Sequence, residues 1–167
     1  MDIFEIIKTR RSIRKFTEEP VPDEIVNRII EAGIWAPSGL NNQPWKFAII
    51  RDKELKIKIS ALTHYSQIVL SSNVLIAVFL DHSISYDRTK DAQAIGACMQ
   101  NMLLFIHSEG LGAVWLGQIL KNRDKVLELL NGPEELELMA VLALGHPAVN
   151  GGKGNRKDPD QTIFFRQ

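Results

Sequence analysis

The hydrophobic residues of this chain recur in blocks, and several blocks have the spacing of amphipathic helices. Residues 2–9 carry apolar side chains at mixed helical spacing and predict a short opening helix. Pro22 and Asp23 open a second helix, whose apolar side chains from Ile25 to Gly33 share one face. The clearest helix spans residues 91–109 and ends at Gly110. A helix of that length and pattern is typical of the core of a domain or of a dimer.

Three other blocks predict strands. Residues 45–50 indicate a buried strand, and residues 74–80 indicate a central strand buried on both faces, because their apolar run is almost unbroken. Residues 138–144 indicate a third apolar strand, closed by residues 145–147. Residues 54–72 alternate less cleanly than a strand should and favour a helix. Asn122 is expected to cap a helix that runs through Leu130 and ends at residues 131–133.

Composition narrows the class of protein. The 167 residues, 45% of them hydrophobic, predict a single globular domain over residues 1–167 with a proper core. The formal net charge of zero predicts no general attraction to nucleic acid or to an anionic membrane. The single cysteine, Cys98, excludes an intramolecular disulfide, argues against a metal site and fits a reducing cytoplasm. No signal peptide and no apolar run long enough to span a bilayer is present.

A loop rich in carboxamides lies at residues 36–47. Pro37 and Pro44 stiffen its backbone, and Gly39 leaves room for another molecule to approach the main chain. One serine hydroxyl and three carboxamides lie between the prolines. Such groups read the edge of a neutral heterocycle, or they tie down the loop's own backbone. The loop sequence by itself leaves both interpretations open.

Two basic clusters and a glycine-rich segment add a second kind of chemistry. Five cations lie between Lys8 and Lys15, and such a set beside Ser12 is suited to a phosphate, although a solvated basic face remains the alternative. Residues 150–159 form a smaller basic cluster in a polar tail. The glycines of residues 110–117 lack dinucleotide-fingerprint spacing, so we expect this segment to press its backbone amides against a flat ligand.

The last residues of the chain have a different character from the polar tail before them. Residues 162–165 are apolar with strand propensity, and an exposed stretch of this kind would be an aggregation hazard. We therefore expect them to pair with a sheet edge, either the chain's own or a partner's.

The usual catalytic motifs are absent from this sequence. It contains no serine elbow, no zinc-protease motif and no cysteine placed beside a histidine, and its four histidines are scattered. The clusters instead suit a planar heterocycle with a phosphate tail, and the heterocycle would then carry the chemistry. We therefore assign no catalytic residue to the chain itself.

Four motifs together resemble the nitroreductase family of FMN-dependent oxidoreductases. They are residues 10–16, residues 36–47, the glycine segment from Gly110 to Gly117, and residues 145–147. The resemblance covers nearly the whole chain and keeps the family's order. It implies an α+β fold with a central mixed β-sheet flanked by helices. It also implies an obligate homodimer with two FMN molecules at its interface and the C-terminal strand exchanged between subunits.

The resemblance also implies which residues bind the cofactor. Residues 10–14 and a cation of the tail would hold the phosphate and ribityl chain. Residues 37–39 would come from the other subunit and lie against the flavin ring. Backbone amides near residue 117 would also contact the ring. The implied FMN-binding set is Arg10, Arg11, Ser12, Arg14, Pro37, Ser38, Gly39, Asn41, Gln43, His64, Gln67, Leu116, Gly117, Gln118, and Arg156 or Lys157.

The function implied is hydride transfer from NADH or NADPH through flavin N5 to a nitroaromatic, a quinone or a similar small oxidant, by a ping-pong scheme. Two alternatives remain. One is a flavin reductase served by another donor, and the other is an FMN carrier or sensor that does not turn over.

Overall fold

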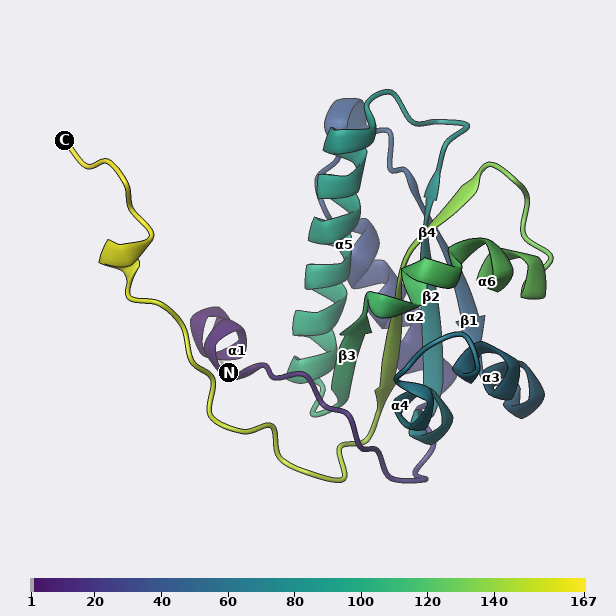
Figure 1. Cartoon of the computed structure of the whole chain (residues 1–167). Coiled ribbons are helices and arrows are strands. Elements are labelled where there is room, and N and C mark those ends of the chain that lie inside the picture. Colours follow the sequence, from purple (N-terminus) through teal and green to yellow (C-terminus); the bar gives the residue numbers. More distant parts are fainter. Residues whose placement is uncertain (1) are drawn as a thin grey trace.

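The computed structural model describes residues 2–167 and has a β-sheet covered by helices on both faces (Figure 1). In chain order its elements are α1 (Ile3–Thr9), α2 (Asp23–Ile34), η1 (Gly39–Asn41), β1 (Trp45–Ile50), α3 (Lys53–Ser60), α4 (Ser66–Ser71), β2 (Val74–Asp81), α5 (Arg88–Ser108), β3 (Gly112–Leu116), η2 (Gln118–Asn122), α6 (Arg123–Leu129), β4 (Leu136–Gly145) and η3 (Pro159–Gln161). The predicted α+β fold is confirmed.

The sheet has the strand order β1-β2-β4-β3, and each neighbouring pair is antiparallel. All eight residues of β2 are buried, which confirms residues 74–80 as the central strand. The strand pairs are thus all antiparallel where a mixed sheet was expected, and an isolated bridge between Ser12 and Ala113, outside the strands, is parallel. The N-terminal basic segment therefore lies along the β3 edge.

Alternate residues of the central strands enter two different cores, because successive side chains of a strand point to opposite faces. Ile76 and Val78 of β2 pack in a core with α2 and α5, whereas Leu75 and Phe79 pack in a second core with α3, α4 and α6. Figure 1 shows α5 standing along one face of the sheet. The predicted apolar face of residues 91–109 is thus the inner face of α5, and Cys98 is buried within it.

Some sequence-based expectations need correction. Residues 45–50 do form a strand, but β1 is at the edge of the sheet and Ile49 is 46% exposed. Residues 54–72 form two helices instead of one, α3 and α4, with a turn between them. The strand β3 was not predicted. Asn122 lies at the start of α6 as expected, but its side-chain amide donates to the Leu62 carbonyl at 2.8 Å instead of capping the helix.

The C-terminal stretch forms no strand within the described residues 2–167. It contains the short turn η3, after which Phe164 is fully exposed and Phe165 is 69% exposed. Figure 1 shows this tail running past α1 and away from the sheet. Pairing with the chain's own sheet is therefore wrong, and pairing with a partner's sheet stays a prediction. Throughout residues 2–167, every helix is too short or too polar to cross a membrane.

Candidate functional site

A basic cradle lies where the N-terminal segment meets the C-terminal tail. The Ile13 amide donates to the Ala113 carbonyl at 3.0 Å, and the Ala148 amide donates to the Lys15 carbonyl at 3.0 Å, so residues 10–16 are held between β3 and the tail. The cavity formed there measures about 310 Å³ and is lined by Arg10, Arg11, Ser12, Arg14, Gly152, Lys153, Gly154, Asn155 and Arg156. The structure thus brings both predicted basic clusters into one place.

The positive charge of the cradle is not neutralised by acidic side chains. Over the described part of the chain, none of its five cations forms a salt bridge. Burial, and then the charges of Arg156 and Arg11, hold the pKa of Arg10 below its ordinary value. The guanidinium groups repel one another yet stay protonated, since arginine does not deprotonate in proteins. An anion placed in the cradle would relieve this repulsion.

Arg11 shapes the cradle as well as charging it. Its Nε donates to the Gly152 carbonyl at 3.1 Å, and one terminal nitrogen donates to the Lys8 carbonyl at 2.7 Å. A Cβ added at Gly154 would lie only 2.3 Å from the Arg11 guanidinium, so a larger residue there would require that guanidinium or the tail to shift. Gly154 thus packs closely against the Arg11 guanidinium.

A second group of predicted residues gathers at the far end of β3. The Gln118 side-chain oxygen accepts from the Thr63 hydroxyl at 2.8 Å and from the His64 amide at 2.9 Å, which ties the turn before α4 to η2. Gly117 is exposed directly before η2. Since a strand rises about 3.3 Å per residue, Gly117 lies about 13 Å along the edge from Ala113, the residue opposite Ser12.

The remaining predicted residues in this region differ in what they can present. His64, whose amide donates to Gln118, and Gln67 of α4 are exposed, whereas the Leu116 side chain is buried in the core under α6. Leu116 can therefore offer a ligand only its backbone. Of the two tail cations, Arg156 lines the cradle and Lys157 is not among its lining residues in the described structure.

The carboxamide loop, residues 37–43, mostly ties down its own backbone. The Ser38 hydroxyl accepts from the Gln43 amide at 3.0 Å, and the Gln43 side chain donates to the Asn41 carbonyl at 3.4 Å. Leu40, Asn41 and Gln43 all have positive φ angles, of 54°, 56° and 49°. For Gln43, these contacts favour a role in fixing the loop's own backbone over a role in recognising the edge of a heterocycle.

The loop and the cradle lie at opposite ends of α5. Asn42 donates to Asp91 in the first turn of α5 at 2.8 Å, whereas Thr9, next to the cradle, contacts His107 in its last turn at 2.8 Å. At a rise of 1.5 Å per residue, these two positions on α5 are about 24 Å apart. The carboxamide loop and the cradle therefore do not meet within one chain.

Several residues of these groups were not singled out from the sequence. Lys153 and Asn155 line the cradle, and the only sequence signal for them was the basic character of residues 150–159. Tyr86 lies against Gly39, a contact that no local pattern indicates. Within residues 2–167, no group of three or more metal-ligating side chains is placed to hold an ion. Burial raises the pKa of the Cys98 thiol to about 12, as expected for a packing residue.

Comparison with known proteins shows the family to which this fold belongs. The family model described as the nitroreductase family matches residues 7–71 and 60–146. A candidate NADH dehydrogenase/NAD(P)H nitroreductase of Methanothermobacter thermautotrophicus is 38% identical, covering 96% of this chain and 85% of that protein. The FMN reductase [NAD(P)H] of Bacillus subtilis is 30% identical, covering 91% of this chain and 70% of that protein.

Solved structures agree with these sequence relatives. The crystal structure of a candidate nitroreductase from Desulfovibrio desulfuricans in complex with FMN has a TM-score of 0.95 and 45% identity, and covers 100% of this chain and 98% of that one. The fold is thus that of an α+β protein, with the un-neutralised cations of the cradle at one sheet edge. The chain belongs to the nitroreductase family, as the four sequence motifs predicted.

Proposed function

We propose that this protein is an FMN-dependent oxidoreductase that uses NADH or NADPH. The observation that carries this proposal is the arrangement along β3, where an un-neutralised cradle at Ser12 is followed about 13 Å later by the exposed backbone of Gly117. A ligand that consists of a phosphate, a sugar chain and a flat ring system presents an anion at one end and a planar group at the other. Its length is similar to this distance of about 13 Å. The cofactor complex of the Desulfovibrio desulfuricans structure supports FMN as the occupant.

The cradle would hold the phosphate of FMN. Arg10, Arg14 and Arg156 offer charged donors, and the Ser12 hydroxyl offers a neutral one. Gly117 and Gln118 would lie at the ring, with His64 and Gln67 at its edge. When bound, FMN would supply hydride transfer through its N5 atom, from the nicotinamide to a nitroaromatic, a quinone or a similar small oxidant. The chain's own task is to bind and orient the cofactor and to leave one ring face open to both substrates in turn.

The working form would be a homodimer. In one chain, residues 37–39 are held near the first turn of α5, whereas the cradle lies beside its last turn, about 24 Å away along the helix. A second copy would supply the loop to the first and receive the same loop in return. This symmetric exchange gives a closed dimer with two equivalent sites.

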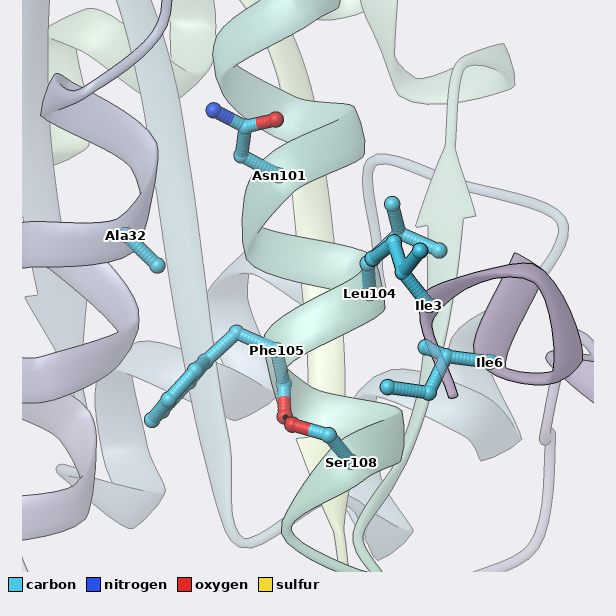
Figure 2. A pocket seen from close by; sticks show the side chains of 7 residues that line it. All are labelled: Ile3, Ile6, Ala32, Asn101, Leu104, Phe105 and Ser108. Carbon is cyan, nitrogen blue, oxygen red and sulfur yellow. Dashed lines mark hydrogen bonds between the residues drawn. The ribbon is translucent and has the colours of Figure 1, made fainter. Parts of the chain in front are cut away.

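An apolar groove indicates where the second copy would pack. Figure 2 shows Ile3 and Ile6 of α1 pointing toward Leu104 of α5, and Phe105 on the side of α5 that faces Ala32. This groove measures about 260 Å³. Ile3 and Phe4 are 61% and 60% exposed beside it, and so much apolar surface on one helix is typical of an interface. The long helix α5 would then lie at the centre of the dimer.

Stopped-flow bleaching of bound flavin tests the proposed donor. Protein reconstituted with FMN and mixed anaerobically with NADH or NADPH should lose its flavin absorbance rapidly with at least one of them. Rapid return of the absorbance on mixing the reduced protein with a quinone, after the nicotinamide is removed, is the result that a ping-pong scheme predicts.

Slow bleaching by both nicotinamides would contradict the proposed donor. Reduction by dithionite followed by rapid reoxidation with a quinone would then indicate a reductase served by another donor. Failure of reoxidation as well would indicate a carrier or sensor.

A further inference from the structure

The carboxylate of Asp91 joins three segments of the chain at the first turn of α5. Its side chain is fully buried. One oxygen accepts from the Asn42 side-chain amide at 2.8 Å. The other accepts from the Ser85 hydroxyl at 2.6 Å and from the Tyr86 and Asp87 amides at 3.1 and 3.3 Å. Asp91 therefore connects α5 both to the loop after β2 and to the carboxamide loop.

Asp91 is held as a buried anion by neutral donors. Burial alone would raise the pKa of this carboxyl, but the hydrogen bonds from Ser85, Asn42 and the two backbone amides hold it below its ordinary value. In the described part of the chain, no salt bridge involves Asp91. Since no cation compensates the charge, each of these donors stabilises the ionised carboxylate. The carboxylate in turn holds each donor in place.

The carboxamide loop needs such an anchor. Three of its non-glycine residues have positive φ angles, a conformation that persists only where the surroundings enforce it. Within residues 2–167, the side-chain hydrogen bonds from residues 37–43 to the rest of the chain all come from Asn42, which donates to Asp91 and, at 3.3 Å, to the Ile84 carbonyl. The side-chain oxygen of Asn42 is buried without a hydrogen-bond partner, so the hydrogen bonds donated by its NH₂ group orient the carboxamide.

Asp91 also reaches the loop by a second route. It holds the backbone of Tyr86, and the Tyr86 hydroxyl fills the space beside Gly39, where an added Cβ would lie only 1.7 Å from the hydroxyl oxygen. Gly39 is thus contacted both by Asn42, whose amide donates to its carbonyl at 3.0 Å, and by the Tyr86 ring.

We infer that Asp91 is a positioning residue that sets the conformation of residues 37–43 through Asn42 and Tyr86, and through that loop the binding of the flavin ring in the partner subunit. This inference rests on the proposed function, which places the loop against that ring. Asp91 itself touches no cofactor. Its effect should fall on the ring and not on the phosphate, so FMN and riboflavin should be affected alike.

A reciprocal exchange of the two side chains tests this inference. Asn42→Asp sets a second carboxylate against Asp91 and should raise the dissociation constants of FMN and riboflavin by the same factor, about tenfold, as expected when one member of a contacting pair is changed. Adding Asp91→Asn restores a donor facing an acceptor, because the new amide donates to the new carboxylate while its oxygen still faces Tyr86. The double variant should bind both flavins more tightly than Asn42→Asp alone, but short of the parent protein, because the Ile84 carbonyl to which Asn42 also donates still faces a carboxylate.

Asp81→Asn is the matched control. Asp81 is also a buried aspartate, 7% exposed, and it accepts from the Ser83 amide at 2.9 Å in the same loop after β2. The structure gives its carboxylate no bond to residues 37–43. This variant should lower the unfolding temperature of the flavin-free protein and leave both dissociation constants unchanged.

Three outcomes would overturn the inference while the parent protein binds flavin normally. The first is that Asn42→Asp binds flavin as the parent protein does. The second is that the double variant binds flavin no more tightly than Asn42→Asp, and the third is that Asp81→Asn weakens flavin binding as much as Asn42→Asp does. A parent protein that binds neither FMN nor riboflavin would instead overturn the proposed function.

Discussion

Removing the chain after Asp160 is expected to yield a protein that dimerises weakly and has lost its flavin. The deleted stretch includes Ile163, Phe164 and Phe165, which are 41%, 102% and 69% exposed in the single chain. Burying three such side chains against a partner would contribute several kcal/mol per subunit, at about 25 cal/mol per Å² of apolar surface. Because the proposed cofactor site is shared between subunits, flavin that binds only the native dimer must stabilise that dimer. Loss of dimerisation should therefore weaken flavin binding, and loss of flavin should weaken the dimer.

Light scattering and flavin absorbance, measured on the same truncated sample, test both halves of this expectation. Truncation after Phe165 is the matched control, since it removes only Arg166, which pairs with Asp160 at 3.6 Å, and Gln167. That shorter deletion should keep the dimer and its flavin. A truncated monomer that retains its full flavin content would refute the shared site, and with it the homodimer.

Arg10→Ala should weaken FMN binding roughly ten- to a hundredfold and leave riboflavin binding nearly unchanged. A hydrogen bond to a charged group contributes about 1.5–3 kcal/mol, and riboflavin has no phosphate with which to form one. Removing Arg10 also relieves its repulsion with Arg156 and Arg11, so the flavin-free protein should not lose stability through charge.

Titration of flavin-free protein with FMN and with riboflavin measures this difference directly. Lys15→Ala is the control, because Lys15 is an exposed cation of the same segment that does not line the cradle. An equal loss for both ligands would show that Arg10 acts through the fold and not through a phosphate.

Most of the fold could be predicted where the pattern was long and unambiguous. The apolar run of β2 and the periodicity of α5 each reflect burial along a whole element, so their sequence signals were strong. The strand β3 was missed because it is only five residues long, lies at a sheet edge and begins with a glycine. The break between α3 and α4 was missed because residues 61–65 contain neither glycine nor proline.

The cradle was more predictable than the contacts that organise the carboxamide loop. Arginines clustered at residues 10–14 and cations clustered in the tail each carry a local signal, and the family resemblance implied that they meet at one phosphate. Asp91 carries no such signal, because an aspartate in the first turn of a helix is ordinarily explained by the helix dipole. Its bonds to Asn42 and Ser85 exist only in the tertiary structure.

Identification of the released cofactor tests the central claim most directly. The purified protein should be yellow, and the supernatant after denaturation should contain FMN, with one molecule for each chain, when compared with FMN, FAD and riboflavin standards. Protein that arrives without flavin should take up FMN to the same content on reconstitution. Release of FAD, or failure to retain FMN after reconstitution, would contradict the assignment of the basic cradle as an FMN phosphate site.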